Sequence, residues 1–207
     1  GAAPINHAII NGESQTGLTT FFIEKEIDTG MIIHREKTEI LPDETAGELH
    51  DKLMMLGGKL IVKTVNDIIN DSVNPISQKD LMKEFPKIHS ANKIFKEDCR
   101  IYWNKDKIDI YNFIRGLSPY PCAWSEMVNS INQKTISFKV YRTRIINENH
   151  GLMPGNIMTD NKNFLKITVK DGYIDILELQ LQGKKRMTVK QVLNGFDPRD
   201  YEIKKPE

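Results

Sequence analysis

The sequence predicts an α/β segment followed by a mainly β barrel. Two β-rich stretches, at 16–24 and 31–38, precede a long stretch with helical spacing of apolar residues, whereas short strand-like segments dominate the last third of the chain. Charge divides the chain in a similar way. Residues 1–90 carry nine Lys and Arg against fourteen Asp and Glu, and residues 91–207 carry twenty against fourteen. An acidic part joined to a basic part predicts two units with different partners.

The composition is that of an ordinary soluble protein. The 207 residues are 39% hydrophobic and 28% charged, enough for one large or two small domains. No apolar run approaches membrane-spanning length and no signal pattern opens the chain, so we expect a cytoplasmic protein. Cys99 and Cys122 form no CxxC motif and are expected as reduced core thiols. The five histidines lack metal-ligand spacing, so we expect no metal.

The first unit is expected to begin with a short helix over 4–11 and to continue with the two strands. Thr45 and Glu48 have the spacing of a capping box, which predicts a helix from Ala46. Its apolar stripe consists of Leu49, Leu53, Leu56, Leu60 and Ile61. The pair Gly57-Gly58 predicts either a break in this helix or a close backbone contact.

A tight loop with the sequence Glu26-Ile27-Asp28-Thr29-Gly30 connects the two predicted strands. Gly30 allows a turn that would strain other residues. The loop therefore presents the Asp28 carboxylate at the end of a hairpin. From the residues alone, Asp28 is either a catalytic group or ordinary turn chemistry.

The polar stretch 71–91 contains Pro75 and Pro86 and has little sustained periodicity. It predicts a linker that crosses the surface. We therefore expect a first unit over 1–73, a linker over 74–92 and a second unit over 93–207.

The second unit is expected to open with a helix capped by Asp106 and ending near Gly116. Strand candidates follow at 123–128, 135–145, 164–170 and 173–179, and Asp171-Gly172 is a strong hairpin signal between the last two. Thr188 and Gln191 form a second capping box, which predicts a short helix ending at Gly195. Several short strands with few helices predict a small barrel.

Several residues of the basic unit could contact nucleic acid. Lys184-Lys185-Arg186 follow Gly183, and three adjacent cations either contact phosphates or form a solvated loop. Arg115 either reaches a phosphate or caps the end of its helix. Trp103 and Trp124 could stack on bases, but both are better explained as core aromatics.

Segments along nearly the whole chain resemble, in order and spacing, the methionyl-tRNA formyltransferases. They are residues 1–6, 11–17, 26–30, 53–58, 93–103, 114–124 and 183–185. The resemblance implies a remnant of a formyltransferase Rossmann-like domain, followed by an oligonucleotide-binding-like barrel that faces tRNA. It implies that Ile27, Asp28, Thr29 and Gly30 border the folate and that Asp28 is catalytic. It also implies tRNA contacts for Lys93, Lys96, Arg115, Lys184, Lys185 and Arg186.

The implied reaction transfers a formyl group from 10-formyltetrahydrofolate to the α-amine of methionyl-initiator tRNA, without a metal. In this family the aspartate acts with an Asn and a His that lie upstream of the segment matching 1–6. We therefore expect the 207-residue chain to be catalytically incomplete and inactive alone. The parent enzyme is expected to be monomeric, and the exposed sheet edge of the chain predicts self-association.

Two other functions stay open at this point. One is another 10-formyltetrahydrofolate-dependent formyltransferase or hydrolase domain, acting on an amino sugar nucleotide or on free formyltetrahydrofolate. The other is a non-enzymatic RNA-binding module built on the barrel. The basic balance of the second unit favours RNA over the first alternative, and Asp28 favours an enzyme over the second.

Overall fold

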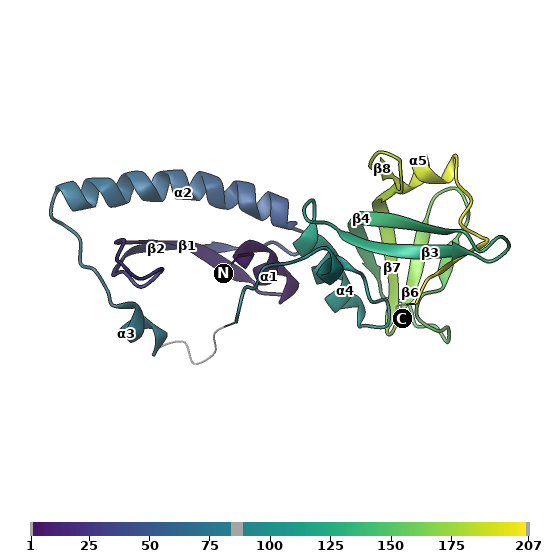
Figure 1. Cartoon of the computed structure of the whole chain (residues 1–207), viewed down its shortest axis with the longest axis horizontal. Coiled ribbons are helices and arrows are strands. Elements are labelled where there is room, and N and C mark those ends of the chain that lie inside the picture. Colours follow the sequence, from purple (N-terminus) through teal and green to yellow (C-terminus); the bar gives the residue numbers. More distant parts are fainter. Residues whose placement is uncertain (1, 84–88, 206–207) are drawn as a thin grey trace.

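The computed structural model describes residues 2–83 and 89–205. Its first lobe consists of α1 (Pro4–Ile10), β1 (Gln15–Phe21), β2 (Ile32–Glu39) and α2 (Ala46–Ile69). The two strands pair antiparallel, with Leu18 opposite Glu36. The long helix α2 lies along this hairpin (Figure 1). The sequence predicted both strands and both helices.

Helix α2 begins where the capping box predicts. The Thr45 side chain accepts a hydrogen bond from the Glu48 backbone at 3.3 Å, and the Glu48 carboxylate accepts one from the Thr45 backbone at 2.8 Å. The expectation for Gly57-Gly58 is wrong. The helix continues through both glycines, and a Cβ at Gly58 would meet no atom within 4 Å. Packing of the helix against the hairpin outweighs the glycine penalty of about 1 kcal/mol per residue.

Part of the segment expected as a linker is ordered against the first lobe. Helix α3 (Gln78–Met82) lies within it. Ile76 and Ile32 exchange backbone hydrogen bonds of 2.8 and 2.9 Å. The polar composition concealed this pairing, which depends on a strand more than forty residues earlier. Residues 84–88 of the expected linker lie outside the described residues.

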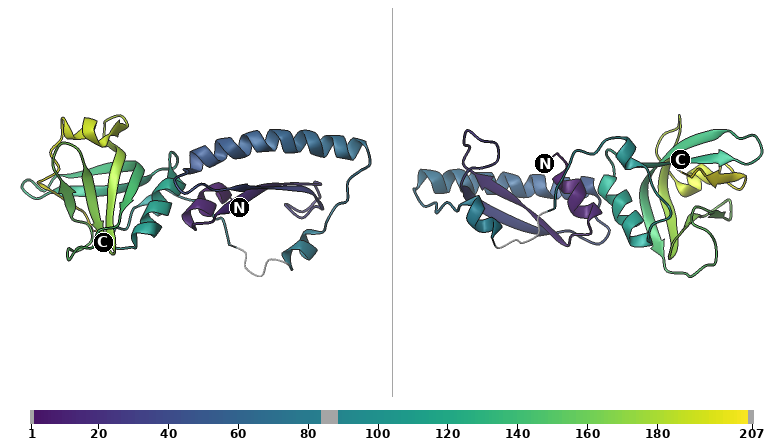
Figure 2. Two further views of the ribbon diagram at one scale, coloured as in Figure 1. Left: turned by 180° about the vertical axis from the view of Figure 1, so that it is seen from behind. Right: turned by 60° about the horizontal axis from the view of Figure 1, so that its bottom comes forward.

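The described part of the second lobe is a nearly closed antiparallel sheet with helices packed against it (Figure 2). The strand order is β5-β6-β7-β4-β3-β9, and β8 pairs with β7. Its elements are η1 (Glu97–Cys99), α4 (Lys107–Leu117), β3 (Ala123–Asn129), β4 (Thr135–Ile146), β5 (Ile157–Thr159), β6 (Leu165–Val169), β7 (Gly172–Leu181), β8 (Met187–Thr188), α5 (Val189–Leu193) and β9 (Tyr201–Ile203). The predicted barrel-like arrangement is confirmed, and the short strands β5, β8 and β9 are additional to those predicted.

The interior of the second lobe is filled by aliphatic side chains from α4 and the strands. Ile114, Val140, Ile174 and Ile176 are fully buried there. Trp103 is also buried, and its indole nitrogen donates to Ser125 Oγ at 3.0 Å. Trp103 is therefore a core aromatic, as expected.

Helix α4 begins directly after Asp106, but Asp106 does not cap it. The Lys107 backbone donates to Asp171 Oδ1 at 2.7 Å, so the predicted hairpin turn supplies the cap. Asp106 instead forms an ion pair of 3.0 Å with Lys170. The capping prediction is wrong because the competing carboxylate comes from a turn far along the chain.

The two lobes meet where α1 crosses α4. A Cβ at Gly116 would lie 2.6 Å from Ile10 Cγ1, so only glycine allows this approach of the helices. Asn6 Nδ2 donates to the Gly116 carbonyl at 2.8 Å. The helix α4 ends at Leu117, next to Gly116 as predicted, and Gly116 also provides the contact that joins the lobes. No helix of the described residues is long and apolar enough to cross a membrane.

Candidate functional site

The loop that carries Asp28 is fixed at its base. The Phe22 backbone donates to the Met31 carbonyl at 3.0 Å, and Gln78 Nε2 donates to the Gly30 carbonyl at 2.8 Å. Gly30 is buried, and a Cβ there would lie 1.6 Å from the Phe22 carbonyl oxygen. Gly30 is therefore required for close approach of the two backbones.

The tip of this loop is open to solvent. Asp28 is exposed and adopts a left-handed φ of 57°, a conformation that Asp tolerates better than most residues. Thr29 Oγ1 donates to the Glu26 carbonyl at 3.0 Å. Ile23 and Ile27 are 93% and 88% exposed. The tip thus offers a carboxylate and apolar surface, which together can contact a ring that carries N–H donors.

The Asp28 loop lies at the end of the hairpin that points away from the barrel (Figure 1). The start of α2 touches the second lobe, where the Gly47 backbone donates to the Ser118 carbonyl at 3.0 Å. Further along α2, Thr64 contacts Thr20 at 3.0 Å, close to the end of β1. The helix rises about 26 Å between these two points, at about 1.5 Å per residue. Asp28 and the barrel are therefore separated by most of the length of the first lobe.

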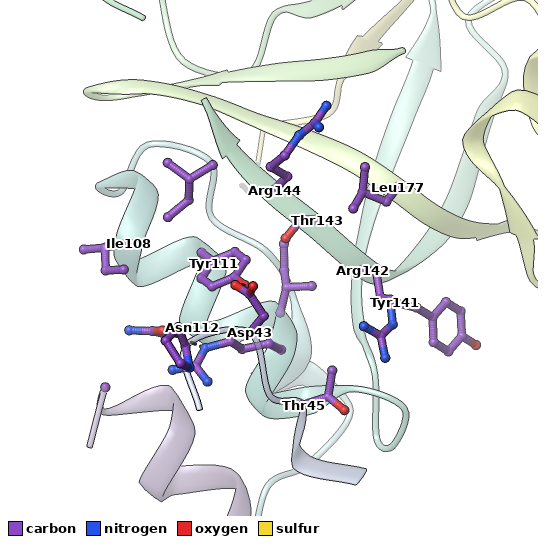
Figure 3. Close-up of a pocket in the computed structure, with 15 residues that line it drawn as sticks. Asp43, Thr45, Ile108, Tyr111, Asn112, Tyr141, Arg142, Thr143, Arg144 and Leu177 are labelled. Carbon is purple, nitrogen blue, oxygen red and sulfur yellow. Dashed lines mark hydrogen bonds between the residues drawn. The ribbon is translucent and has the colours of Figure 1, made fainter. Parts of the chain in front are cut away.

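A cleft of about 680 Å³ lies at the junction of the lobes (Figure 3). Its walls are the turn at 42–45 before α2, helix α4 and strand β4. Tyr111 Oη donates to Asp43 Oδ1 at 2.6 Å, joining α4 to that turn. Burial and this bond to the Asp43 carboxylate raise the pKa of Tyr111 to about 12, so the phenol stays protonated at neutral pH.

The structure places Arg115 inside this junction rather than on an outer surface. Its side chain is buried and donates to Asn112 Oδ1 at 2.9 Å and to the Glu44 carbonyl at 2.9 Å. Burial lowers the pKa of Arg115. Arg115 does not cap its own helix, and its bonds to the turn before α2 hold the lobes together.

The other arginines of the junction cleft are paired with carboxylates of this chain. Arg142 and Arg144 alternate along β4, so both side chains lie on one face of the strand. Arg142 forms an ion pair with Glu48 at the start of α2, and Arg144 pairs with buried Asp175 at 2.6 Å. Because both guanidinium groups are paired, the cleft offers little free positive charge to a ligand. The pair between Arg142 and Glu48 instead links the two lobes.

The remaining predicted cations lie in the turn between β7 and β8 and in the segment that leads into the second lobe. Lys184 and Lys185 are exposed in the turn between β7 and β8. Arg186 donates to Glu178 at 2.7 Å through Nε, and its guanidinium lies 4.4 Å from the centre of the Tyr141 ring. Lys93 and Lys96 are also exposed, and Lys93 lies 5.3 Å from the centre of the Phe95 ring.

The structure brings some of these cations together and keeps others apart. Lys96 and Gly183 line one cleft, so the lysine turn and Lys96 share a face of the barrel. Lys139 lines the same cleft and was missed, because an isolated lysine in a strand carries no signal in the sequence. Arg115 lies apart, at the junction. Among residues 2–83 and 89–205, no three His, Cys, Asp or Glu side chains are grouped to hold a metal.

Comparison with known proteins identifies the class. Residues 93–197 match the family described as "Formyl transferase, C-terminal domain", and residues 1–65 match the family described as "Formyl transferase". The chain therefore belongs to the formyl transferase family.

Particular relatives narrow this class. The chain is 48% identical to methionyl-tRNA formyltransferase of Bacteroides thetaiotaomicron over 196 residues, which cover 95% of this chain and 60% of that protein. It is also 48% identical to the methionyl-tRNA formyltransferase of Phocaeicola vulgatus, with 97% of this chain and 61% of that protein covered. The chain thus spans about 60% of the length of these relatives.

Solved structures share the fold at lower identity. The structure of HypX from Aquifex aeolicus in complex with tetrahydrofolic acid superposes with a TM-score of 0.66 at 17% sequence identity. The match covers 97% of this chain and 36% of HypX. The likeness establishes the arrangement of both lobes, and HypX itself is a protein crystallised with a folate.

Proposed function

We propose that this chain supplies the Asp28 loop and the tRNA-facing barrel of a methionyl-tRNA formyltransferase. The reaction transfers a formyl group from 10-formyltetrahydrofolate to the α-amine of methionyl-initiator tRNA. We assign residues 1–73 to the folate-binding catalytic unit, 74–92 to the connection and 93–207 to the tRNA-binding unit. The 48% identity to two methionyl-tRNA formyltransferases over nearly the whole chain supports the proposal.

The observation that carries the proposal is the separation between Asp28 and the face of the barrel that presents Lys96, Lys139, Lys184 and Lys185. The contacts of α2 with the barrel and with the hairpin lie about 26 Å apart along the helix, a distance that a small substrate bound at Asp28 would not span. A tRNA is long enough to place its body against the barrel and its aminoacyl end at the hairpin loop. The separation therefore supports a macromolecular substrate over an amino sugar nucleotide.

Asp28 would act on charge and protons at the reacting centre. The methionyl amine must lose a proton as it attacks the formyl carbon, and the tetrahedral intermediate carries a negative oxygen. An exposed carboxylate on a fixed loop base can hold a water that relays the proton and can favour a neighbouring cation. Ile27, Thr29 and Gly30 would border the folate beside it, with the exposed Ile27 side chain covering apolar ring surface.

A formylation assay of the whole protein that carries this chain tests the proposal. Asp28→Asn keeps the shape of the side chain and removes its charge. We expect turnover at saturating 10-formyltetrahydrofolate and methionyl-tRNA to fall at least a hundredfold, on the order of the loss from removing one preorganised electrostatic group, while the dissociation constant for tRNA changes less than about twofold. Asp51→Asn on the exposed face of α2 is a matched control. Unchanged turnover for Asp28→Asn would show that Asp28 is a turn residue without a catalytic role.

A further inference from the structure

A second cleft, of about 630 Å³, opens on the outer face of the barrel. Tyr120 and Trp124 line it from one side, and Gln180 and Gln182 line it from strand β7 and the turn after it. In the sheet, Trp124 lies opposite Lys139, and Lys139 lies opposite Gln180. The cleft therefore combines aromatic, amide and cationic groups in one continuous row across three strands.

The aromatic side of the cleft contains one ring held in place and one ring open to solvent. The Trp124 indole nitrogen donates to the Lys96 carbonyl at 2.8 Å, and the Arg100 guanidinium lies 5.3 Å from the centre of its ring. Tyr120 is 83% exposed. A large aromatic side chain at this exposure gains little from folding, so its ring is available to stack on a ligand.

The cleft is positively charged at its rim and uncharged at its base. Lys96 and Lys139 line it, and Lys184 and Lys185 follow the lining residue Gly183. Within the described part of the chain, none of these four ammonium groups forms an ion pair. Among the described residues that line the cleft, Glu126 is the one carboxylate, and it pairs with Arg100 at 3.2 Å.

The base of the cleft contains two thiols. Cys99 and Cys122 are free and buried, and both line the cleft. Burial raises the pKa of Cys122 to about 11 and also raises the pKa of Cys99, so both groups stay neutral at physiological pH. A neutral base beneath a cationic rim suits a ligand with a flat uncharged ring and an attached anion.

We propose that this cleft holds one unpaired nucleotide of the bound RNA, with its base against Tyr120 and its phosphates toward Lys96, Lys139 and the Lys184 turn. This inference rests on the proposed function, because it takes RNA as the partner of the barrel. Phosphates alone would need only the lysines. The exposed ring beside them suits a base whose face is free, whereas in a duplex the stacked neighbouring bases cover both faces of each base.

The amide side chains give the base a hydrogen-bonding partner. Gln182 Oε1 accepts a bond from the Ser137 backbone at 3.2 Å, which fixes the orientation of the amide and leaves its N–H donors for a ligand. Those donors can pair with a carbonyl or ring nitrogen of a base. Stacking supplies most of the affinity and the amide adds a modest base preference.

Fluorescence titration of the full chain with a short single-stranded RNA carrying 2-aminopurine tests the inference. Stacking on Tyr120 is expected to quench the probe. Tyr120→Leu should weaken binding about tenfold and abolish most of the quenching, since one base stacked on an aromatic ring contributes about that much. Tyr120→Trp keeps a stacking surface and should bind at least as well as the wild type. Tyr102→Leu, at a partly exposed tyrosine outside the cleft, should change neither signal.

The outcomes separate this inference from the proposed function. Wild-type binding with equal affinity and quenching in Tyr120→Leu would overturn the stacking site and leave RNA binding intact. Equal losses in Tyr120→Leu for single-stranded and fully duplex RNA would also overturn it, because a duplex offers no free base. Absence of binding by the wild type to both this RNA and tRNA would overturn the proposed function itself.

Discussion

The two lobes differ in how much of their apolar surface they bury. The barrel encloses a large cluster of fully buried aliphatic side chains between α4 and the strands. Among the described residues of the first lobe, the buried cluster is smaller and consists of Ile9, Ile40, Ala46, Leu49 and Leu53. This lobe leaves a row of apolar side chains exposed on the outer face of α2, including Met55, Ile61 and Val62. The barrel is therefore stabilised by its own core, whereas the first lobe depends more on caps, backbone pairing and its contacts with α4.

The largest difference should come from truncating matched isoleucines in the two lobes. Ile176 is fully buried in the barrel, and Ile61 on α2 is 52% exposed. Ile176→Ala should lower the free energy of unfolding by about 2–5 kcal/mol, because it leaves a cavity in a packed core. Ile61→Ala should change it by less than about 0.5 kcal/mol. Urea denaturation measures both, and an equal loss from Ile61→Ala would show that this face of α2 is covered in solution.

Within the first lobe, replacing Gly30 and Gly58 by alanine should have opposite effects on stability, because only Gly30 is needed for close packing of the backbone. Gly30→Ala would place a Cβ 1.6 Å from the Phe22 carbonyl, so the Asp28 loop must shift. We expect a loss of about 2 kcal/mol in stability, a large loss of formylation in the whole protein that carries this chain, and unchanged binding of RNA by the barrel. Gly58→Ala has open space and should stabilise α2 by about 0.5–1 kcal/mol. Normal formylation by Gly30→Ala would mean that the loop position is not needed for the chemistry.

A smaller effect should come from the contact that joins the lobes. Tyr111→Phe removes the hydrogen bond to Asp43 and should destabilise the chain by about 1 kcal/mol. The pKa of Tyr111 is raised from 10.0 to about 12, so this contribution is complete below pH 10 and is lost as the pH rises toward 12. Denaturation at neutral and alkaline pH, with Tyr102→Phe as the control, checks both statements. A difference from wild type that persists above pH 12 would contradict the assigned role of the hydroxyl.

Local signals in the sequence located most of the fold. The capping boxes at Thr45 and Thr188 place α2 and α5, and Asp171-Gly172 places the β6–β7 hairpin. These features depend on residues three or fewer positions apart. The short strand β9 was not predicted, because three residues are too few to show an alternating pattern. Its pairing with β3 also joins residues more than seventy positions apart.

The candidate site shows the same limit. The Asp28 loop could be predicted because its glycine, aspartate and flanking strands are contiguous. The burial of Arg115 could not, since its acceptor at Glu44 is 71 residues away. Lys139 and Tyr120 join the lysine turn only when the sheet is assembled. Sequence therefore predicts the parts of the site that are local, and misses those that depend on which faces come together.

The salt dependence of tRNA affinity tests the central claim most directly, namely that the barrel binds the RNA and the distant hairpin performs the chemistry. The titration compares the wild-type chain, the Asp28→Asn variant and a variant with Lys184, Lys185 and Arg186 replaced by Ala. The triple replacement should weaken binding to different tRNAs alike and reduce the slope of log affinity against log salt by about two. The reason is that binding releases fewer condensed counterions when fewer phosphates are neutralised. Asp28→Asn should superimpose on the wild type. A triple variant that superimposes on the wild type, or an Asp28→Asn variant that loses as much affinity as the triple variant, would contradict the account.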